Sequence, residues 1–168
     1  MNPSFVPRVA PRPIRELLRG RHLLVTGATG FVGKVWLSHL LAHVPDIGRI
    51  TLLVRSTRQR SAAERAADLL DTSPAFRPLK ERLGDGWRSF VADRVDVLDG
   101  DVSRPDCGLD AATLGHLAHS VDATLHLAGL TDFHPDPARG VPANVDGALH
   151  VADRSEERRV GKEGRSRW

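Results

Sequence analysis

The chain has 168 residues, and its 40% hydrophobic and 27% charged content is that of a globular domain, not of a disordered segment. Its net charge of +3 arises in residues 154–168, so residues 1–153 are neutral overall and no nucleic-acid-binding surface is expected. The apolar runs are of strand length and the first twenty residues do not resemble a signal peptide, so we expect no transmembrane segment and a cytoplasmic protein.

Short apolar runs and helical periods alternate along the chain. The apolar runs predict strands from His22 to Val25, Arg49 to Val54, Arg94 to Leu98 and Ala123 to Ala128. The helical periods predict helices from Phe31 to Val44, Ser61 to Leu70, Pro78 to Leu83, Trp87 to Val91, Asp110 to Leu117 and onward from near Asn144. This alternation predicts an α/β fold with a doubly wound, Rossmann-type parallel sheet, truncated after four strands in the order 3-2-1-4.

A glycine-rich turn joins the first predicted strand to the first long helix. Gly27, Gly30 and Gly33 are spaced three residues apart in Thr-Gly-Ala-Thr-Gly-Phe-Val-Gly. In such a turn the first glycine permits the tight bend, the second lets the backbone approach a pyrophosphate, and the third lets the helix pack close to the sheet. A glycine triplet alone also fits a plain helix cap, but the flanking strand and helix favour dinucleotide binding.

The residue that ends the second strand indicates which dinucleotide is bound. An acidic side chain there binds the ribose 2′-hydroxyl, whereas a basic one accommodates a 2′-phosphate. Arg55 occupies this position and Arg58 follows it, so we expect NADP(H) as the cofactor, although an exposed loop arginine remains the alternative. Asp101 follows the third strand and suits an acceptor for the adenine amino group or, equally, a turn residue.

Three segments are therefore expected. An N-terminal arm, residues 1–21, carries a short helix from Ile14 to Leu18, and residues 22–153 form an incomplete NADP-binding Rossmann domain. Residues 154–168 have no hydrophobic period and resemble translated sequencing adapter, so we expect a non-native tail; a solvated basic terminus is the alternative. Because the fourth strand would lack a neighbour on one side, we expect this chain alone to aggregate or to be loosely folded.

Several strings together resemble fatty acyl-CoA reductases and the related thioester reductase domains of the extended short-chain dehydrogenase/reductase superfamily. The similarity runs from about Ile14 to Asp153 and rests on these strings: Thr-Gly-Ala-Thr-Gly-Phe-Val-Gly-Lys, Pro45 to Val54-Arg55, Gly100-Asp101-Val102, Gly108-Leu109, His126-Leu127-Ala128-Gly129 with Phe133, and Asn144-Val145-Asp146-Gly147. The long connection between the second and third strands, with Thr72 to Phe76 and Leu79-Lys80, resembles that of bacterial members.

The resemblance implies a set of cofactor-binding residues. The phosphate turn would be formed by Gly27, Thr29, Gly30, Phe31, Val32 and Gly33, and the 2′-phosphate would be held by Arg55 and Arg58. The adenine rim would be Asp101 and Val102, and the chain under the nicotinamide-side ribose would be Ala128, Gly129 and Leu130. Asn144 would be a structural asparagine of the following helix.

The resemblance also implies the activity of the full-length enzyme. Hydride from NADPH would reduce the thioester of a fatty acyl-CoA or an acyl carrier protein to an aldehyde, or onward to an alcohol. The family uses a Ser or Thr, a Tyr and a Lys for proton transfer; this chain contains no tyrosine, so we expect no catalytic residue here and an inactive fragment. A sugar-nucleotide epimerase or dehydratase and a non-catalytic NADP-binding module remain alternatives, and oligomeric state is left open.

Other reactive side chains have simpler interpretations. His116 and His119 lie three residues apart on a predicted helix, but no third ligand follows at a suitable spacing, so no metal site is expected. His126 is interpreted as a packed strand residue and Cys107 as a lone thiol in a polar loop. The segment from Thr131 to His134 follows a strand, and it could face substrate or form an ordinary loop.

Overall fold

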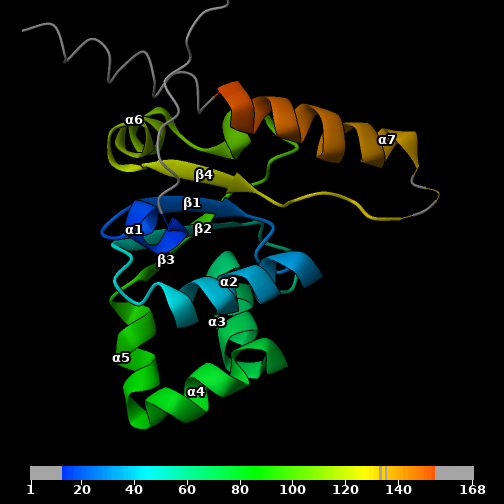
Figure 1. Cartoon of the computed structure of the whole chain (residues 1–168). Helices are drawn as coiled ribbons and strands as arrows, with labels where there is room; N and C mark the ends of the chain where they lie inside the picture. Colours follow the sequence, from blue (N-terminus) through cyan, green and yellow to red (C-terminus); the bar gives the residue numbers. More distant parts are fainter. Residues whose placement is uncertain (1–12, 133, 135, 154–168) are drawn as a thin grey trace, which may run out of the picture.

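The computed structural model of the chain describes residues 13–132, 134 and 136–153. Four strands form one parallel sheet in the order β3-β2-β1-β4 (Figure 1). They are β1 (His22–Thr26), β2 (Arg49–Val54), β3 (Val95–Asp99) and β4 (Ala123–His126). The predicted fold class and strand order are confirmed.

Helices cover both faces of this sheet. They are α1 (Ile14–Leu18), α2 (Phe31–His43), α3 (Ala62–Thr72), α4 (Arg77–Leu83), α5 (Trp87–Ala92), α6 (Ala111–Ser120) and α7 (Pro137–Val141). Short 3-10 helices occur at Pro74–Phe76, Gly84–Gly86 and Pro105–Gly108. In Figure 1, α2 to α5 lie on one side of the sheet, and α6 and α7 lie on the other.

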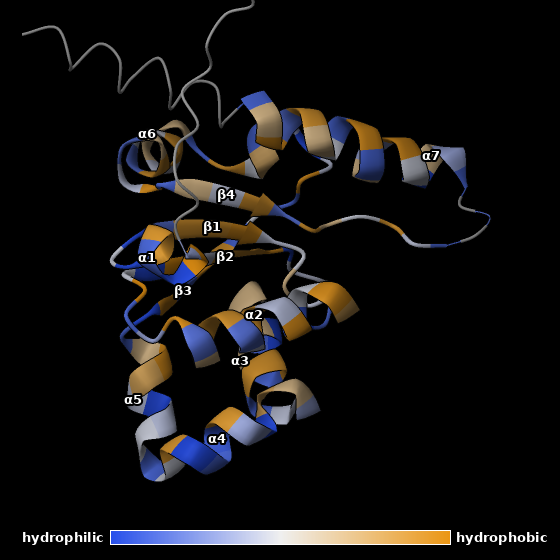
Figure 2. Ribbon diagram, viewed as in Figure 1, coloured by the Kyte–Doolittle hydropathy of each residue, from blue (hydrophilic) through white to orange (hydrophobic). Residues whose placement is uncertain are grey.

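The main core lies between the sheet and the α2 to α5 layer. Every residue of β2 after Arg49 is buried, as expected for a central parallel strand covered on both faces. Phe76 is fully buried and packs against Trp87 with ring centroids 5.9 Å apart, so the long connection between β2 and β3 joins this core. Figure 2 shows the apolar colour concentrated on β1 and β2, whereas α4 is largely hydrophilic.

A smaller apolar cluster lies on the opposite side of the sheet. Its buried members are Leu24, Leu53, Cys107, Val121 and Val151. Cys107 is only 4% exposed, which corrects the expectation of a thiol in a polar loop. The cause is its place in the 3-10 turn after β3, which turns the side chain into the cluster.

Strand and helix boundaries differ from the predictions in a few places. β3 is shifted by one residue, and β4 ends two residues earlier than predicted because the chain at Leu127 and Ala128 packs against Gly27. The last helix begins at Pro137 and not near Asn144. Asp136 caps it by accepting the Ala138 N–H over 3.0 Å.

The last helix then passes through a π-helical turn. Pro142–Asp146 forms this turn, and residues 147–153 continue as α-helix. The expected tail at residues 154–168 and the first twelve residues of the expected arm lie outside the described residues. Within the described part of the chain, no helix is both long enough and apolar enough to cross a bilayer.

Candidate cofactor-binding site

The glycine-rich turn between β1 and α2 is packed too tightly for side chains at two of its three glycines. Gly27 has a φ of +73°, and a Cβ there would collide with the main chain of Leu127 and Ala128. A Cβ on Gly33 would collide with the carbonyl oxygen of Gly27. The end of β4 and the first turn of α2 therefore both lie directly against this turn, which leaves its outer side accessible to a ligand.

The N-terminus of α2 presents backbone N–H groups beside the turn. Gly30 donates its N–H to the Gly27 carbonyl over 3.0 Å, whereas the first N–H groups of an α-helix have no acceptor within the helix. Together with the helix dipole, such groups favour an anion such as a pyrophosphate. Phe31 and Val32, the first two residues of α2, are 79% and 62% exposed.

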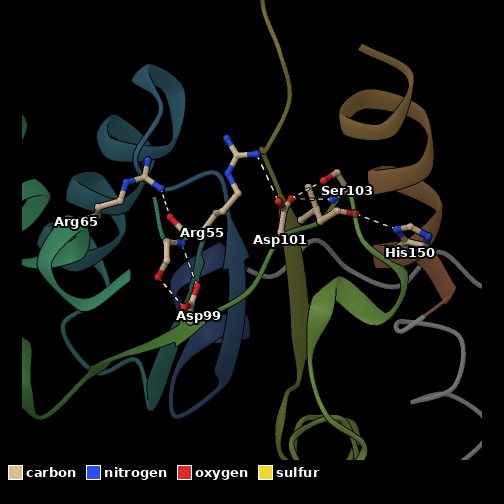
Figure 3. Close-up of polar contacts among 8 residues, drawn as sticks. Arg55, Arg65, Asp99, Asp101, Ser103 and His150 are labelled. Atoms are coloured by element: carbon tan, nitrogen blue, oxygen red, sulfur yellow. Dashed lines mark hydrogen bonds and ion pairs between the residues drawn. The ribbon is translucent and has the colours of Figure 1, made fainter. Parts of the chain in front are cut away.

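Two arginines meet at the carboxyl end of β2. Arg55 directly follows the strand, and its guanidinium lies 3.4 Å from Asp101 Oδ2. Arg65 projects from α3 and donates a hydrogen bond to the carbonyl oxygen of Arg55 (Figure 3). Arg58 is exposed and does not line the cleft described below. The structure therefore brings Arg65, and not Arg58, beside Arg55.

Asp101 lies just beyond the carboxyl end of β3, within ion-pair distance of Arg55. Its Oδ1 accepts two hydrogen bonds from Ser103, from N–H at 3.0 Å and from Oγ at 2.7 Å. Burial by itself raises the pKa of Asp101, but the Ser103 hydrogen bonds and the nearby Arg55 charge outweigh it, and the pKa lies below its ordinary value. Asp101 is therefore an ionised acceptor near neutral pH.

The adjacent Val102 is held by the last helix. His150 Nδ1 lies 2.9 Å from the Val102 carbonyl oxygen (Figure 3). Because a carbonyl only accepts, this ring nitrogen carries the proton. A Cβ on Gly147 would lie 3.1 Å from the Val102 side chain, so helix and loop are in close contact. The loop after β3 is thus braced from the helix as well as through Asp101.

The chain that leaves β4 is supported by two polar side chains. Thr26 Oγ1 accepts the N–H groups of Leu127 and Ala128 at 3.3 and 3.4 Å, and it lies 2.7 Å from His126 Nδ1. Asn144 holds Leu130 from the other side, accepting its N–H at 2.7 Å and donating to its carbonyl oxygen at 3.0 Å. The segment from Leu127 to Leu130 therefore has a defined path along the site.

These elements enclose one cleft of about 430 Å³. Of the residues predicted to bind a cofactor, its lining includes Gly27, Thr29, Gly30, Arg55, Asp101, Val102, Ala128, Gly129 and Leu130. The lining leaves out Phe31, Val32, Gly33, Arg58 and Asn144. Sequence reasoning missed three polar residues that line the cleft, namely Arg65, Ser103 and Arg139. The helix-capping pattern Ser61-x-x-Glu64 locates the first turn of α3, from which Arg65 could have been placed near the ends of the strands.

The remaining candidate residues have structural surroundings. His126 is half-buried and bonded to Thr26, as its interpretation as a packed strand residue predicts. His119 Nδ1 lies 2.6 Å from the Gly115 carbonyl oxygen of its own helix. Among the described residues, no group of three histidine, cysteine or acidic side chains is placed to hold a metal ion. Thr131, Asp132 and His134 are exposed, and Phe133 lies outside the described residues.

We expect His126 to make the stability of this region sensitive to pH. Thr26 Oγ1 already accepts two N–H groups, so its hydroxyl proton points to His126 Nδ1, which must then be unprotonated. Burial lowers the pKa of His126 below the ordinary 6.5, so its contribution to stability is present above pH 6.5 and is lost as the pH falls through the folded-state pKa. We expect the melting temperature to fall in this range.

The measurement is thermal unfolding of the wild type and of His126→Gln between pH 5 and 8. We expect a shallower pH dependence in the variant. Part of the slope should persist, because burial also lowers the pKa of His22. Superimposable pH profiles would show that the titration of His126 does not affect folding.

The sequence matches the family model described as "Male sterility protein" over residues 25–162. The chain belongs to this family. The alcohol-forming fatty acyl-CoA reductase of Simmondsia chinensis is similar to this male sterility family domain. The two are 31% identical over 141 residues, which cover 83% of this chain and 29% of the relative. The isonitrile lipopeptide synthase of Mycobacterium tuberculosis is 34% identical over 125 residues, or 74% of this chain and 5% of that protein.

Solved structures of similar fold include reductase domains. The terminal R domain of the myxalamid PKS-NRPS pathway superposes with a TM-score of 0.64 at 27% identity, covering 80% of this chain and 31% of that one. The reductase domain of a Mycobacterium tuberculosis non-ribosomal peptide synthetase gives 0.62 at 33% identity, covering 80% and 30%. The male sterility family domain therefore spans less than a third of each of these relatives. Family and fold identify it as an NAD(P)-binding reductase module.

Proposed function

We propose that this chain binds NADP(H) and forms the cofactor-binding part of a reductase that converts fatty acyl thioesters to aldehydes or alcohols. One observation carries the choice of cofactor. At the end of β2, where NAD-binding folds place an acidic residue, Arg55 and Arg65 both line the cleft. Arginine gives charge-assisted, bidentate hydrogen bonds to phosphate, and its planar donors suit a ribose 2′-phosphate.

The residues present fit a dinucleotide along the length of the cleft. The positions of Gly27 and Gly33 admit no Cβ, and the N-terminus of α2 offers N–H groups to a pyrophosphate. Asp101 would accept a hydrogen bond from the adenine amino group, and Ala128 to Leu130 would pass under the second ribose. When bound, NADPH supplies hydride to a carbonyl carbon.

This reduction also requires a proton, and the chain contains no tyrosine that could donate it. We therefore propose that this chain binds the cofactor without turnover, and that the reductase activity belongs to a longer protein. The thioester substrate is proposed from the similarity to a fatty acyl-CoA reductase and to non-ribosomal peptide synthetase reductase domains. Either CoA or a carrier protein would serve as the thiol component.

The proposal is tested by comparing NADPH with NADH. The soluble fraction from size-exclusion chromatography is titrated with each cofactor, and nicotinamide fluorescence follows binding. We expect NADPH to bind about 10- to 100-fold more tightly, as charge-assisted hydrogen bonds to one phosphate would give. Equal affinities would contradict the choice of NADP(H), and binding of neither cofactor would contradict the assignment of the cleft.

A further inference from the structure

The loop that carries Arg55 is tied to the neighbouring strand by an acidic side chain outside the cleft. Asp99 is the last residue of β3, and it lies opposite Val54 in the parallel pairing of β2 with β3. Its Oδ1 accepts the N–H of Ser56 at 3.0 Å, and its Oδ2 accepts the Ser56 hydroxyl at 2.6 Å. Both carboxylate oxygens are therefore bonded to the residue that directly follows Arg55 (Figure 3).

Ser56 passes this restraint on to α3. Its Oγ accepts the N–H of Ala62, the first residue of that helix, at 2.9 Å. This N–H has no acceptor within the helix, so Ser56 provides one from the preceding loop. Asp99, Ser56 and Ala62 thus form a continuous chain of hydrogen bonds from the end of β3 to the start of α3.

Arg65 lies one turn further along the same helix and returns to the loop. It donates to the carbonyl oxygen of Arg55, as described above. The backbone of Arg55 is therefore held on one side through Ser56 and on the other through Arg65. Neither Asp99 nor Ser56 lines the cleft, yet both guanidinium groups that do so depend on this loop for their relative position.

We infer that Asp99 is a positioning residue for 2′-phosphate recognition, acting through Ser56 to hold Arg55 and Arg65 together at the end of β2. The inference rests on the proposed binding of NADP(H). Without the carboxylate, the loop and the start of α3 become more mobile. Arg55 and Arg65 are then no longer held in a fixed position for binding a phosphate. NADH has no 2′-phosphate, so its affinity should be little affected.

If Asp99 acted only through its negative charge, its removal would change NADPH affinity in the opposite direction. A carboxylate close to a bound phosphate repels it, so removal of a merely repulsive charge would tighten NADPH binding. Two substitutions separate the roles. Asp99→Ala removes both hydrogen bonds and the charge. Asp99→Asn removes the charge, keeps an acceptor for the Ser56 N–H, and replaces the acceptor of the Ser56 hydroxyl by an NH2 group that can donate to its oxygen, so the second hydrogen bond is reversed and not lost.

The experiment measures the affinities of the full chain for NADPH and NADH in these variants. We expect Asp99→Ala to reduce the preference for NADPH roughly fivefold, the effect of about one well-formed hydrogen bond. Asp99→Asn should keep the preference within about twofold of the wild type. Ser56→Ala should resemble Asp99→Ala, and combining the two should add little, because they act through one contact.

Asp96→Ala is the matched control. It removes the same charge from the same strand, at a residue that pairs with Arg49 at 3.0 Å, away from the cleft. This variant should retain the wild-type preference. If the wild type prefers NADPH and Asp99→Ala prefers it as strongly or more strongly, the inference about Asp99 is overturned, and the proposed cofactor choice stands. Equal affinity of the wild type for NADPH and NADH would overturn the proposed cofactor choice and this inference with it.

Discussion

Arg55→Ala is expected to weaken NADPH binding by about 30-fold, or ~2 kcal/mol, as loss of a charge-assisted contact to a phosphate does. Arg55 follows β2 directly and lines the cleft, and its side chain is 63% exposed although it pairs with Asp101 at 3.4 Å. A surface ion pair of this kind contributes little by itself, so the side chain is available to a more highly charged ligand. NADH affinity should change by less than about threefold. Titration of the variant with both cofactors measures the two effects.

Two further variants show whether the effect is local. Arg65→Ala should also weaken NADPH selectively, because Arg65 lines the same cleft. Arg88→Ala removes an equal charge from α5, whose residues do not line the cleft, and should leave both affinities unchanged. Equal losses of NADPH and NADH in Arg55→Ala would show that this arginine supports the fold of the cleft and does not recognise a phosphate.

Gly27→Ala is expected to lower the free energy of unfolding by about 3 kcal/mol, which combines the penalty of a left-handed backbone with that of overpacking. Its φ is +73°, and the added Cβ would collide with the main chain of Leu127 and Ala128, which cannot rotate away as a side chain could. For a domain of this size the melting temperature should fall by about 10 °C. Thermal unfolding followed by circular dichroism provides the measurement.

Gly86→Ala is the control for this substitution. Gly86 has a φ of −72°, and a Cβ there would have no heavy atom within 4 Å. The change reduces the freedom of the unfolded chain without strain, so stability should stay the same or rise by up to about 1 kcal/mol. If both alanine variants melted alike, the turn after β1 would be more adaptable than its close contacts indicate.

Periodicity predicted the sheet because its signals are local. The predicted range of β2 matches the strand residue for residue, since a central parallel strand is covered on both faces and is mostly apolar; its one buried polar side chain, Thr51, is bonded to His22. Asp110 caps α6 by accepting the Thr113 N–H over 2.8 Å, again a short-range interaction. The predicted start of the last helix, near Asn144, was wrong: the helix begins at Pro137, and Pro142 lies within it. The π-helical turn at Pro142–Asp146 lets the helix continue through this proline.

The site was predictable only where a residue directly follows a strand or belongs to the turn. Arg55 and Asp101 satisfy this condition, and both line the cleft. Arg65 and His150 reach the site from helices, and their direction depends on loop lengths and packing that no local pattern encodes. Arg58 follows Arg55 closely in sequence, but the path of the loop places it outside the lining.

The position of β1 in the sheet has a consequence for the order of folding. β1 pairs with β2 on one side and with β4 on the other, and Thr26 meets His126 across 100 residues of chain. At synthesis rates of about 5–20 residues per second, β4 is made at least ~5 s after β1, so one edge of β1 stays unpaired for that time. During that interval the apolar run from Leu23 to Val25 presents unpaired main-chain groups, so the nascent chain is most prone to wrong strand pairing before β4 emerges.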